Sequence, residues 1–209
     1  MDWQRLKGRF IVLDGPDGAG KSTQVRLLEG VMSQQGVKVL AVRDPGGTAI
    51  GEKIRRILLD ERNGAMSVRC EALLYMASRA QLYHEQIATA LQEQQCVICD
   101  RWVSSTYAYQ AVAGGVGSET VLQLAETGLE RCWPDLTVII DLASSIGLGR
   151  LSGAPDRMEQ KKPEFHERVR EAFRELAFGR SDFRVVDGSG TIEQVHGRLC
   201  EVLSEYVDS

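Results

Sequence analysis

The chain has 209 residues, a hydrophobic fraction of 43% and a formal net charge of −4. This length supports a substantial core, and we expect a single domain over residues 1–209. The negative charge gives no basic field for a nucleic-acid polymer. No apolar run approaches the roughly 20 residues that span a bilayer, and the N-terminus has no hydrophobic leader. We therefore expect a cytoplasmic protein without a membrane partner.

Five apolar, strand-like runs alternate with segments of helical periodicity. The runs cover 9–14, 37–42, 96–99, 136–142 and 183–187, and the strongest helical pattern extends from about Glu164 to Phe178. Strands that alternate with helices predict an α/β fold, in which helices flank both faces of a doubly wound parallel sheet.

The predicted strands end in polar residues: Asp14, Arg43, Asp100, Asp141 and Asp187. In open α/β sheets, ligands bind beyond the carboxyl ends of the strands, so we expect these residues to surround the site. Asp141 and Asp187 also suit caps of the helices that follow, and for Asp187 we favour that interpretation.

A glycine loop follows the first strand and precedes a helical pattern. Residues 15–22, GPDGAGKS, fit the pattern G-x-x-x-x-G-K-[ST]. Glycines let backbone amides turn inward around an anion at a helix N-terminus. Lys21 adds a positive charge for the β- and γ-phosphates, and the Ser22 hydroxyl can bind Mg²⁺. A simple glycine turn with a surface lysine is the alternative, but the flanking strand and helix favour a nucleotide-phosphate site.

Arginines follow two other strands. Arg43 precedes the segment DPGGT, where two glycines permit close backbone approach, so it suits a second phosphate-bearing ligand; an ordinary turn is the alternative. Asp100 and Arg101 end the third strand, and both should enter the cleft of the glycine loop unless they form a surface pair. Asp14 and Asp17 place carboxylates near phosphates, which indicates Mg²⁺ or a substrate hydroxyl close to them.

Two further segments carry chemistry suited to a heterocyclic base. Residues 73–80 predict a buried helix with Arg79 and, one turn earlier on the same face, Tyr75. A buried guanidinium needs a ligand or a carboxylate, so a structural ion pair is the alternative. The segment 102–110, WVSSTYAYQ, combines hydroxyls and rings; it suits a flat, polar heterocycle, and ordinary packing explains it equally well.

The cysteines and histidines give no catalytic or metal-binding pattern. Cys96 and Cys99 lie in a predicted buried strand where their thiols point to opposite faces, so we expect reduced, structural thiols. His84, His166 and His196 are spread along helical patterns, and we assign them no chemistry. The stretch from Ser144 to Pro163 is rich in glycine, serine and charge, and is either an inert connection or a lid over the phosphates.

The chain resembles the thymidylate kinase family of P-loop nucleoside monophosphate kinases. The resemblance rests on FIVLDGPDGAGKSTQ, RDPGGT, LLYMASRAQ, DRWVSSTYAYQ, PDLTVIIDL, GLGRLSGAPDRME and FHERVREAFRELA, in that order. It implies ATP-dependent phosphorylation of dTMP to dTDP with Mg²⁺, on a doubly wound five-stranded parallel sheet, as a homodimer. It also implies that residues 15–22 form the P-loop and that residues 144–162 form a lid.

The resemblance implies a role for each matching residue. ATP is expected on Gly15, Pro16, Asp17, Gly18, Ala19, Gly20, Lys21, Ser22 and Thr23, and Mg²⁺ on Ser22 and Asp100. The acceptor dTMP is expected on Asp17, Arg43, Tyr75, Arg79, Arg101, Thr106 and Tyr109. Among these, Arg43 and Arg101 contact its phosphate, Tyr75 stacks on thymine and Arg79 hydrogen-bonds the base. Thr106 and Tyr109 contact the base and crowd the 2′ side of the sugar.

Catalysis is expected from Asp17, Lys21, Arg101 and the lid residue Arg150, with Arg157 as a further candidate. Gly18 stands where some members carry an arginine inside the loop, and members without it place catalytic arginines in the lid. The chain departs from the family pattern at Asp44, where glutamate is usual, at Trp102, where tyrosine or phenylalanine is usual, and in a lid shorter by about two residues. The alternatives are a kinase of another nucleoside or nucleoside monophosphate, and a nucleotide-binding regulatory ATPase.

Overall fold

The protein is an α/β fold built around a parallel sheet, as the sequence predicts. The computed structural model describes residues 2–208. Its five strands are β1 Phe10–Asp14, β2 Val39–Arg43, β3 Cys96–Asp100, β4 Leu136–Asp141 and β5 Phe183–Asp187. They lie in the order β2-β3-β1-β4-β5, and every neighbouring pair is parallel. The predicted strands agree with these bounds to within two residues.

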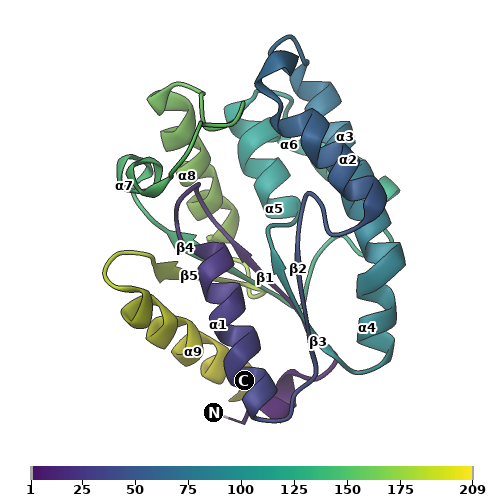
Figure 1. Ribbon diagram of the computed structural model, residues 1–209, viewed down its shortest axis with the longest axis vertical. Coiled ribbons are helices and arrows are strands. Elements are labelled where there is room, and N and C mark those ends of the chain that lie inside the picture. Colours follow the sequence, from purple (N-terminus) through teal and green to yellow (C-terminus); the bar gives the residue numbers. More distant parts are fainter. Residues whose placement is uncertain (1, 209) are drawn as a thin grey trace.

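Helices cover both faces of the sheet (Figure 1). The α-helices are α1 Lys21–Gln34, α2 Ala49–Leu59, α3 Val68–Leu82, α4 Ala88–Gln92, α5 Val103–Thr106, α6 Ser118–Gly128, α7 Ser144–Arg150, α8 Pro163–Ala177 and α9 Ile192–Asp208. Two 3₁₀ turns, η1 Trp3–Leu6 and η2 Glu61–Asn63, and two π-helical segments, η3 Tyr83–Ile87 and η4 Tyr107–Ala113, complete the elements. Helices α1 and α9 pack together on one face of the sheet, and α3, α4 and α6 cover the other.

The central strands are buried on both faces because they are almost entirely apolar. Ile11 and Leu13 of β1 point to the α1–α9 side, whereas Phe10 and Val12 point to the α3–α6 side. Both sets of side chains are 0% exposed. Burying an aliphatic or aromatic side chain of this size stabilises a fold by about 1.5–3 kcal/mol, so these few residues fix the register of the sheet.

Cys96 and Cys99 of β3 confirm the predicted alternation. Cys96 packs in the cluster beneath α1 and α9, and Cys99 in the cluster on the opposite face. Both thiols are free, and burial raises the pKa of the Cys96 thiol to about 12. Thiols with so high a pKa are poor nucleophiles at neutral pH, which agrees with a structural role.

Side-chain caps start the helices that follow β2. The hydroxyl of Thr48 accepts a hydrogen bond from the Gly51 amide at the start of α2, and Ser67 does the same for Cys70 in α3. Such caps satisfy amides that the first helical turn leaves unpaired. Within residues 2–208, no helix is long and apolar enough to cross a bilayer.

Candidate active site

A cavity of about 760 Å³ opens beyond the carboxyl ends of β1, β2 and β3. This volume is within the usual range of small-molecule sites, roughly 300–1,000 Å³. The cavity is lined by nearly all the site residues expected from the sequence: Asp17, Gly18, Ala19, Gly20, Lys21, Ser22, Thr23, Arg43, Tyr75, Arg79, Asp100, Arg101, Thr106, Tyr109 and Arg150. Gly15 and Pro16 do not line it; they face Lys21 with their carbonyl oxygens.

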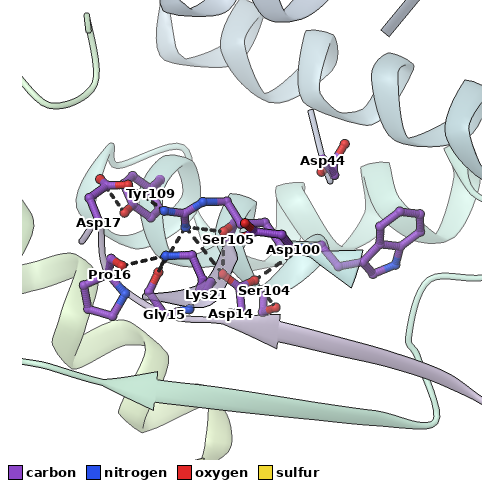
Figure 2. Close-up of polar contacts among 12 residues, drawn as sticks. Asp14, Gly15, Pro16, Asp17, Lys21, Asp44, Asp100, Ser104, Ser105 and Tyr109 are labelled. Atoms are coloured by element: carbon purple, nitrogen blue, oxygen red, sulfur yellow. Dashed lines mark hydrogen bonds and ion pairs between the residues drawn. The ribbon is translucent and has the colours of Figure 1, made fainter. Parts of the chain in front are cut away.

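The Lys21 ammonium is held inside the P-loop. Its Nζ donates to the carbonyl oxygens of Gly15, at 3.0 Å, and Pro16, at 2.7 Å (Figure 2). Burial, and then the positive charge of Arg101, lower the pKa of Lys21 to about 8, although Asp100 and Asp17 act in the opposite direction. A phosphate chain in the cavity would add the negative charge that this buried cation lacks.

Ser22 and Asp100 form a pair of oxygen ligands at the foot of the loop. The Ser22 hydroxyl donates to Oδ2 of Asp100 through a short hydrogen bond. A hydroxyl and a carboxylate side by side are hard oxygen donors of the kind that Mg²⁺ prefers, and Mg²⁺ takes its remaining ligands from water and phosphates. The donor set therefore fits a magnesium ion, with this pair as its protein ligands.

Asp17 is bound to two residues that the sequence assigns to the same ligand. Arg101 Nη2 donates to its Oδ1 at 2.5 Å, and the Tyr109 hydroxyl donates to its Oδ2 at 2.7 Å. Burial raises the pKa of Asp17, but the charges of Arg101 and Lys21 and the Tyr109 hydrogen bond outweigh it, so the pKa lies below its ordinary value. Asp17 is therefore ionised at neutral pH and holds Arg101 against the P-loop.

Asp14 is buried and does not line the cavity, so the expectation that it meets Mg²⁺ or a substrate hydroxyl is wrong. Its side chain is 0% exposed, and its two oxygens accept from Ser104 Oγ at 2.6 Å and Ser105 Oγ at 2.7 Å. It also accepts from the amides of Gly15 and Trp102. Asp14 thus ties the P-loop to the segment after β3.

Arg101 has an unusual backbone conformation at this junction. Its φ is 76°, in the left-handed region that non-glycine residues rarely adopt. Strain of this kind often occurs at functional sites, where surrounding contacts hold a side chain in one direction. Here Asp14 accepts a hydrogen bond from the amide of the next residue, Trp102, and Asp17 accepts one from the Arg101 guanidinium itself.

The segment after β2 supplies two arginines to the cavity. Arg43 is exposed and pairs with Glu52 at 3.2 Å. Arg55 of α2, which sequence reasoning missed, is half-buried and donates to the Pro45 carbonyl at 2.9 Å. Burial and the nearby Arg43 lower the pKa of Arg55. The neighbouring Arg56 is exposed, and only the helical phase of α2 decides which arginine faces the site.

Arg79 lies in a buried ion pair and also lines the cavity. Its Nε and Nη2 donate to Oδ2 of Asp44 at 3.0 and 2.5 Å, and its Nη1 donates to the Thr106 hydroxyl at 3.3 Å. Burial raises the pKa of Asp44 even though Arg79 opposes it. Arg79 therefore forms the structural ion pair that the sequence leaves open as an alternative, and it also lines the cavity. Asp44 lies apart from the cluster around Lys21 (Figure 2).

The segment 102–110 is divided between core and cavity. Trp102 is fully buried, packs edge-on against Phe10 with ring centroids 5.1 Å apart, and donates to the Cys132 carbonyl. Thr106, Tyr109 and Gln110 line the cavity instead. Sequence reasoning did not assign Gln110, although it lies on the same π-helical segment as Tyr109. Tyr75 also lines the cavity, and its hydroxyl has no hydrogen-bond partner among the described residues.

Arg150 and Arg157 have different environments. Arg150 ends α7, is exposed and lines the cavity. Arg157 is buried in an ion pair with Glu71 of α3 and does not line the cavity. The expectation that Arg157 supplements Arg150 is therefore wrong in this structure, because its guanidinium is bound to the body of the protein.

The last two strand ends, like Asp14, lie outside the cavity, contrary to the expectation that all five strand ends surround the site. Asp141 pairs with Arg170 of α8 at 2.7 Å. Asp187 accepts from the amide and hydroxyl of Ser189 in the turn before α9. The favoured interpretation that Asp187 caps the following helix is therefore wrong, because α9 begins only at Ile192. The residues that follow, Gly190, Thr191, Ile192 and Val195, line the cavity near the P-loop and were not foreseen.

The chain is similar to known thymidylate kinases over nearly its whole length. A family model described as "Thymidylate kinase" matches residues 13–199. The "Thymidylate kinase" of Caldanaerobacter subterraneus subsp. tengcongensis is 41% identical over 204 residues, covering 97% of this chain and 98% of the relative. That of Symbiobacterium thermophilum is 42% identical, covering 95% and 94%. The crystal structure of thymidylate kinase from Ehrlichia chaffeensis has a TM-score of 0.76 at 30% identity, covering 94% and 98%.

Proposed function

This chain belongs to the thymidylate kinase family, and from that premise we propose that ATP and dTMP meet end to end in its cavity. The enzyme phosphorylates dTMP. The observation that supports the arrangement is the position of the P-loop between two groups of lining residues. Gly190, Thr191 and Ile192 lie on one side, and Tyr75, Arg79 and Thr106 come from elements on the other. We also propose that residues 1–209 form one catalytic domain.

The donor phosphates are proposed to lie on the P-loop. The loop amides and the N-terminus of α1 favour anions, and the Lys21 ammonium is held inside the loop by the carbonyls of Gly15 and Pro16, where it would face bound phosphates. The β- and γ-phosphates stabilise the charged form of Lys21. The lysine in turn neutralises the charge that gathers on the leaving ADP.

Magnesium is proposed on Ser22 and Asp100. A magnesium ion held there would supply positive charge to offset that of the phosphates. Asp100 orients the Ser22 hydroxyl through the short hydrogen bond between them. The carboxylate of Asp100 also offsets the positive charge of Lys21, which keeps the base of the site close to neutral before nucleotide binds.

The acceptor phosphate is proposed to lie among Arg43, Arg55 and Arg101. An oxygen of the dTMP phosphate attacks the γ-phosphorus of ATP, the bond from that phosphorus to the β–γ bridging oxygen breaks, and ADP leaves. The acceptor oxygen carries no proton at neutral pH, so no general base is required. The arginines bring two polyanions together, which would otherwise repel each other. Asp17 holds Arg101 in place and offers an acceptor to the deoxyribose hydroxyl.

The thymine base is proposed to lie between Tyr75 and the helix that carries Thr106 and Tyr109. Arg79 is fixed by Asp44, so its Nη1 is presented together with the Thr106 hydroxyl. Tyr109 packs against Phe173 with ring centroids 6.2 Å apart. A ring fixed in this way excludes a bulkier sugar substituent, which favours deoxyribose over ribose.

Arg150 is proposed to stabilise the transferring phosphoryl group. It is the one arginine of α7, and it lines the cavity close to Leu151. Its exposure leaves the guanidinium available to a ligand. A charge placed on the equatorial oxygens of the transferring group stabilises the transition state more than the ground state.

We propose that two copies of the chain form a homodimer through α2 and α3. Ile50, Ile57 and Leu73 are 50%, 46% and 54% exposed on these helices, which pack against each other. Contiguous apolar patches on a surface mark interfaces, and these three side chains come from adjoining helices. Sedimentation of the wild-type chain and of Leu73→Glu tests this: the proposal requires the substitution to produce monomers.

A panel of acceptors tests the proposed function. ADP release is measured with ATP, Mg²⁺ and each of dTMP, dUMP, dCMP, dGMP and AMP. We expect dTMP to have the highest kcat/KM. Turnover that favours another monophosphate would contradict the proposed base site, and ATP hydrolysis that ignores every acceptor would contradict the transfer reaction itself.

A further inference from the structure

The lid returns to the body of the protein at Arg157. Residues 151–155 are exposed, whereas Arg157 and Met158 are buried. The backbone amide of Arg157 donates to the Leu59 carbonyl at 3.2 Å, and its Nε donates to the Leu58 carbonyl at 2.8 Å. Its Nη1 makes a short ion pair with Oε1 of Glu71. The returning lid is thus fixed to the end of α2 and to α3.

Glu71 connects this anchor to the cavity. Its other oxygen, Oε2, accepts a hydrogen bond from Nε2 of Gln110 at 3.1 Å. Gln110 is buried, lines the cavity and follows Tyr109 on η4. Three side chains from the lid, α3 and η4 therefore form one chain of hydrogen bonds that begins at the lid and ends in the cavity.

The carboxylate fixes the orientation of the Gln110 amide. An ionised carboxylate only accepts hydrogen bonds, so the amide group that faces Glu71 must be the NH₂. The carbonyl oxygen of Gln110 is then left as a free acceptor. Arg157 binds the other oxygen of Glu71, which fixes the carboxylate in the position that maintains this selection.

The environment of the Glu71–Arg157 ion pair does not indicate a stabilising role. Glu71 and Arg157 are 2% and 6% exposed, so both charges lose their hydration on folding. Moreover, Nη2 of Arg157 is buried without a hydrogen-bond partner among residues 2–208. Buried ion pairs of this kind contribute little net stability, but removing one partner leaves an uncompensated charge. A role in fixing the positions of neighbouring side chains explains the buried pair better.

We propose that Arg157 and Glu71 are positioning residues that couple the lid to the acceptor end of the cavity. They hold the Gln110 amide in one orientation, and they place Asp156, Met158 and Glu159 of the returning lid on the cavity wall. This inference rests on the proposed placement of dTMP at that end. As a consequence, the returning lid is anchored when the acceptor binds beside Gln110, whether or not ATP is bound.

Three variants test the coupling: Glu71→Gln, Arg157→Gln and the double variant, with Arg62→Gln as control. Arg62 forms an exposed pair with Asp60 just after α2, so its loss removes an arginine near the lid anchor without touching the chain of hydrogen bonds. Each protein is measured for the KM of dTMP, the KM of ATP, kcat and its thermal midpoint. Calorimetric titration with dTMP alone gives acceptor affinity without ATP.

We expect each single variant to raise the KM and Kd for dTMP about tenfold, in line with the loss of one buried polar contact, and to leave the KM for ATP within about twofold. The double variant removes both buried charges, so its thermal midpoint recovers toward wild type while its KM for dTMP stays high. The control matches wild type in every parameter. If Arg157→Gln does not fold, Glu71→Gln and the double variant decide the outcome.

Two results would overturn the proposal. One is a double variant with wild-type KM and Kd for dTMP. The other is a parallel rise in the KM values of both nucleotides, which a general structural defect would cause. Failure of the proposed function is separate from these results, because it would appear in the wild-type enzyme as a preference for an acceptor other than dTMP.

Discussion

Gly18 of the P-loop and Gly147 of α7 touch through their backbones. A Cβ atom on Gly18 would overlap the Gly147 carbonyl, and one on Gly147 would overlap the Asp17 carbonyl. Gly18 also has a φ of +72°, which favours glycine. Helix α7 therefore rests on the P-loop only because neither residue has a side chain. An arginine at position 18, as some family members carry, is incompatible with this contact.

We predict that Gly147→Ala lowers kcat at least tenfold, because the methyl group pushes α7, and with it Arg150, away from the P-loop. Gly149→Ala is the matched control, since a Cβ at Gly149 meets no atom of residues 2–208 within 4 Å. Steady-state kinetics with ATP and dTMP check both variants. An equal loss of kcat in both variants would show that alanine acts by changing helix α7 in general and not by disrupting the contact of Gly147 with the P-loop.

Lys21 predicts a pH dependence of ATP binding. The pKa of Lys21 is about 8 in the ligand-free protein, below its ordinary value of 10.5. The ammonium therefore loses its proton as pH rises through about 8, and kcat/KM for ATP should fall over pH 7.5–9.5. Lys21→Met should reduce activity strongly and remove this inflection. A wild-type profile that stays flat to pH 9.5 would contradict the lowered pKa.

Lys21 also predicts a change in stability of the ligand-free protein with pH. Between pH 8 and 10.5 the unfolded chain holds the Lys21 proton and the folded chain does not. The unfolded state then binds more protons, so the Lys21 contribution to the free energy of unfolding rises with pH in this window. Urea unfolding of wild type and Lys21→Met at pH 8 and pH 10 measures the difference between the two slopes.

Asp17→Asn should lower kcat about a hundredfold while the fold persists. The amide removes the charge that holds Arg101 and replaces one acceptor oxygen with a donor. Asp187→Asn is the control, because Asp187 is exposed and lies outside the cavity. Kinetics and circular dichroism together check the prediction. Unchanged turnover in Asp17→Asn would show that this carboxylate does not position the acceptor.

Replacing Arg79 should cost far more stability than replacing Arg43. Arg79→Met leaves the carboxylate of Asp44 buried without its partner, which typically costs about 3–5 kcal/mol. Arg43→Met breaks an exposed pair with Glu52, where such pairs contribute about 0–1 kcal/mol. Urea denaturation gives both free energies of unfolding. Similar values for the two variants would contradict the buried character of the Arg79–Asp44 pair.

Arg150→Ala should lower kcat by about 10³, the lower end of the range for arginines that stabilise phosphoryl transfer, with little change in the KM for ATP. Arg168→Ala, on α8 outside the cavity, is its control. Single-turnover measurements separate the chemical step from product release. A loss confined to the KM for ATP would assign Arg150 to ground-state binding.

The sheet and most of the site follow from the sequence because their signals are local. Each of the five strands is an apolar run between glycine or polar residues, and the P-loop joins strand and helix within a few residues. Parallel strands then bring Lys21, Arg43 and Arg101 to one edge of the sheet. These positions required no knowledge of tertiary contacts.

The remaining site residues depend on contacts that a single sequence does not display. Asp14 and Asp17 are both acidic and close in the chain, yet one is enclosed by serines after β3 and the other faces the cavity. Arg55 differs from Arg56 only by helical phase. Arg157 is a further catalytic candidate from the sequence, and nothing near it in the chain reveals that Glu71 binds it.

The position of β1 at the centre of the sheet has a consequence for biosynthesis. Ile11 pairs with Ile98 of β3 on one side and Leu136 of β4 on the other, so one edge of the first strand stays open until β4 has left the ribosome. The sheet beneath the P-loop is therefore incomplete on a shorter nascent chain. A fragment that stops before β4 would expose an apolar strand edge, which other chains can pair with and aggregate upon.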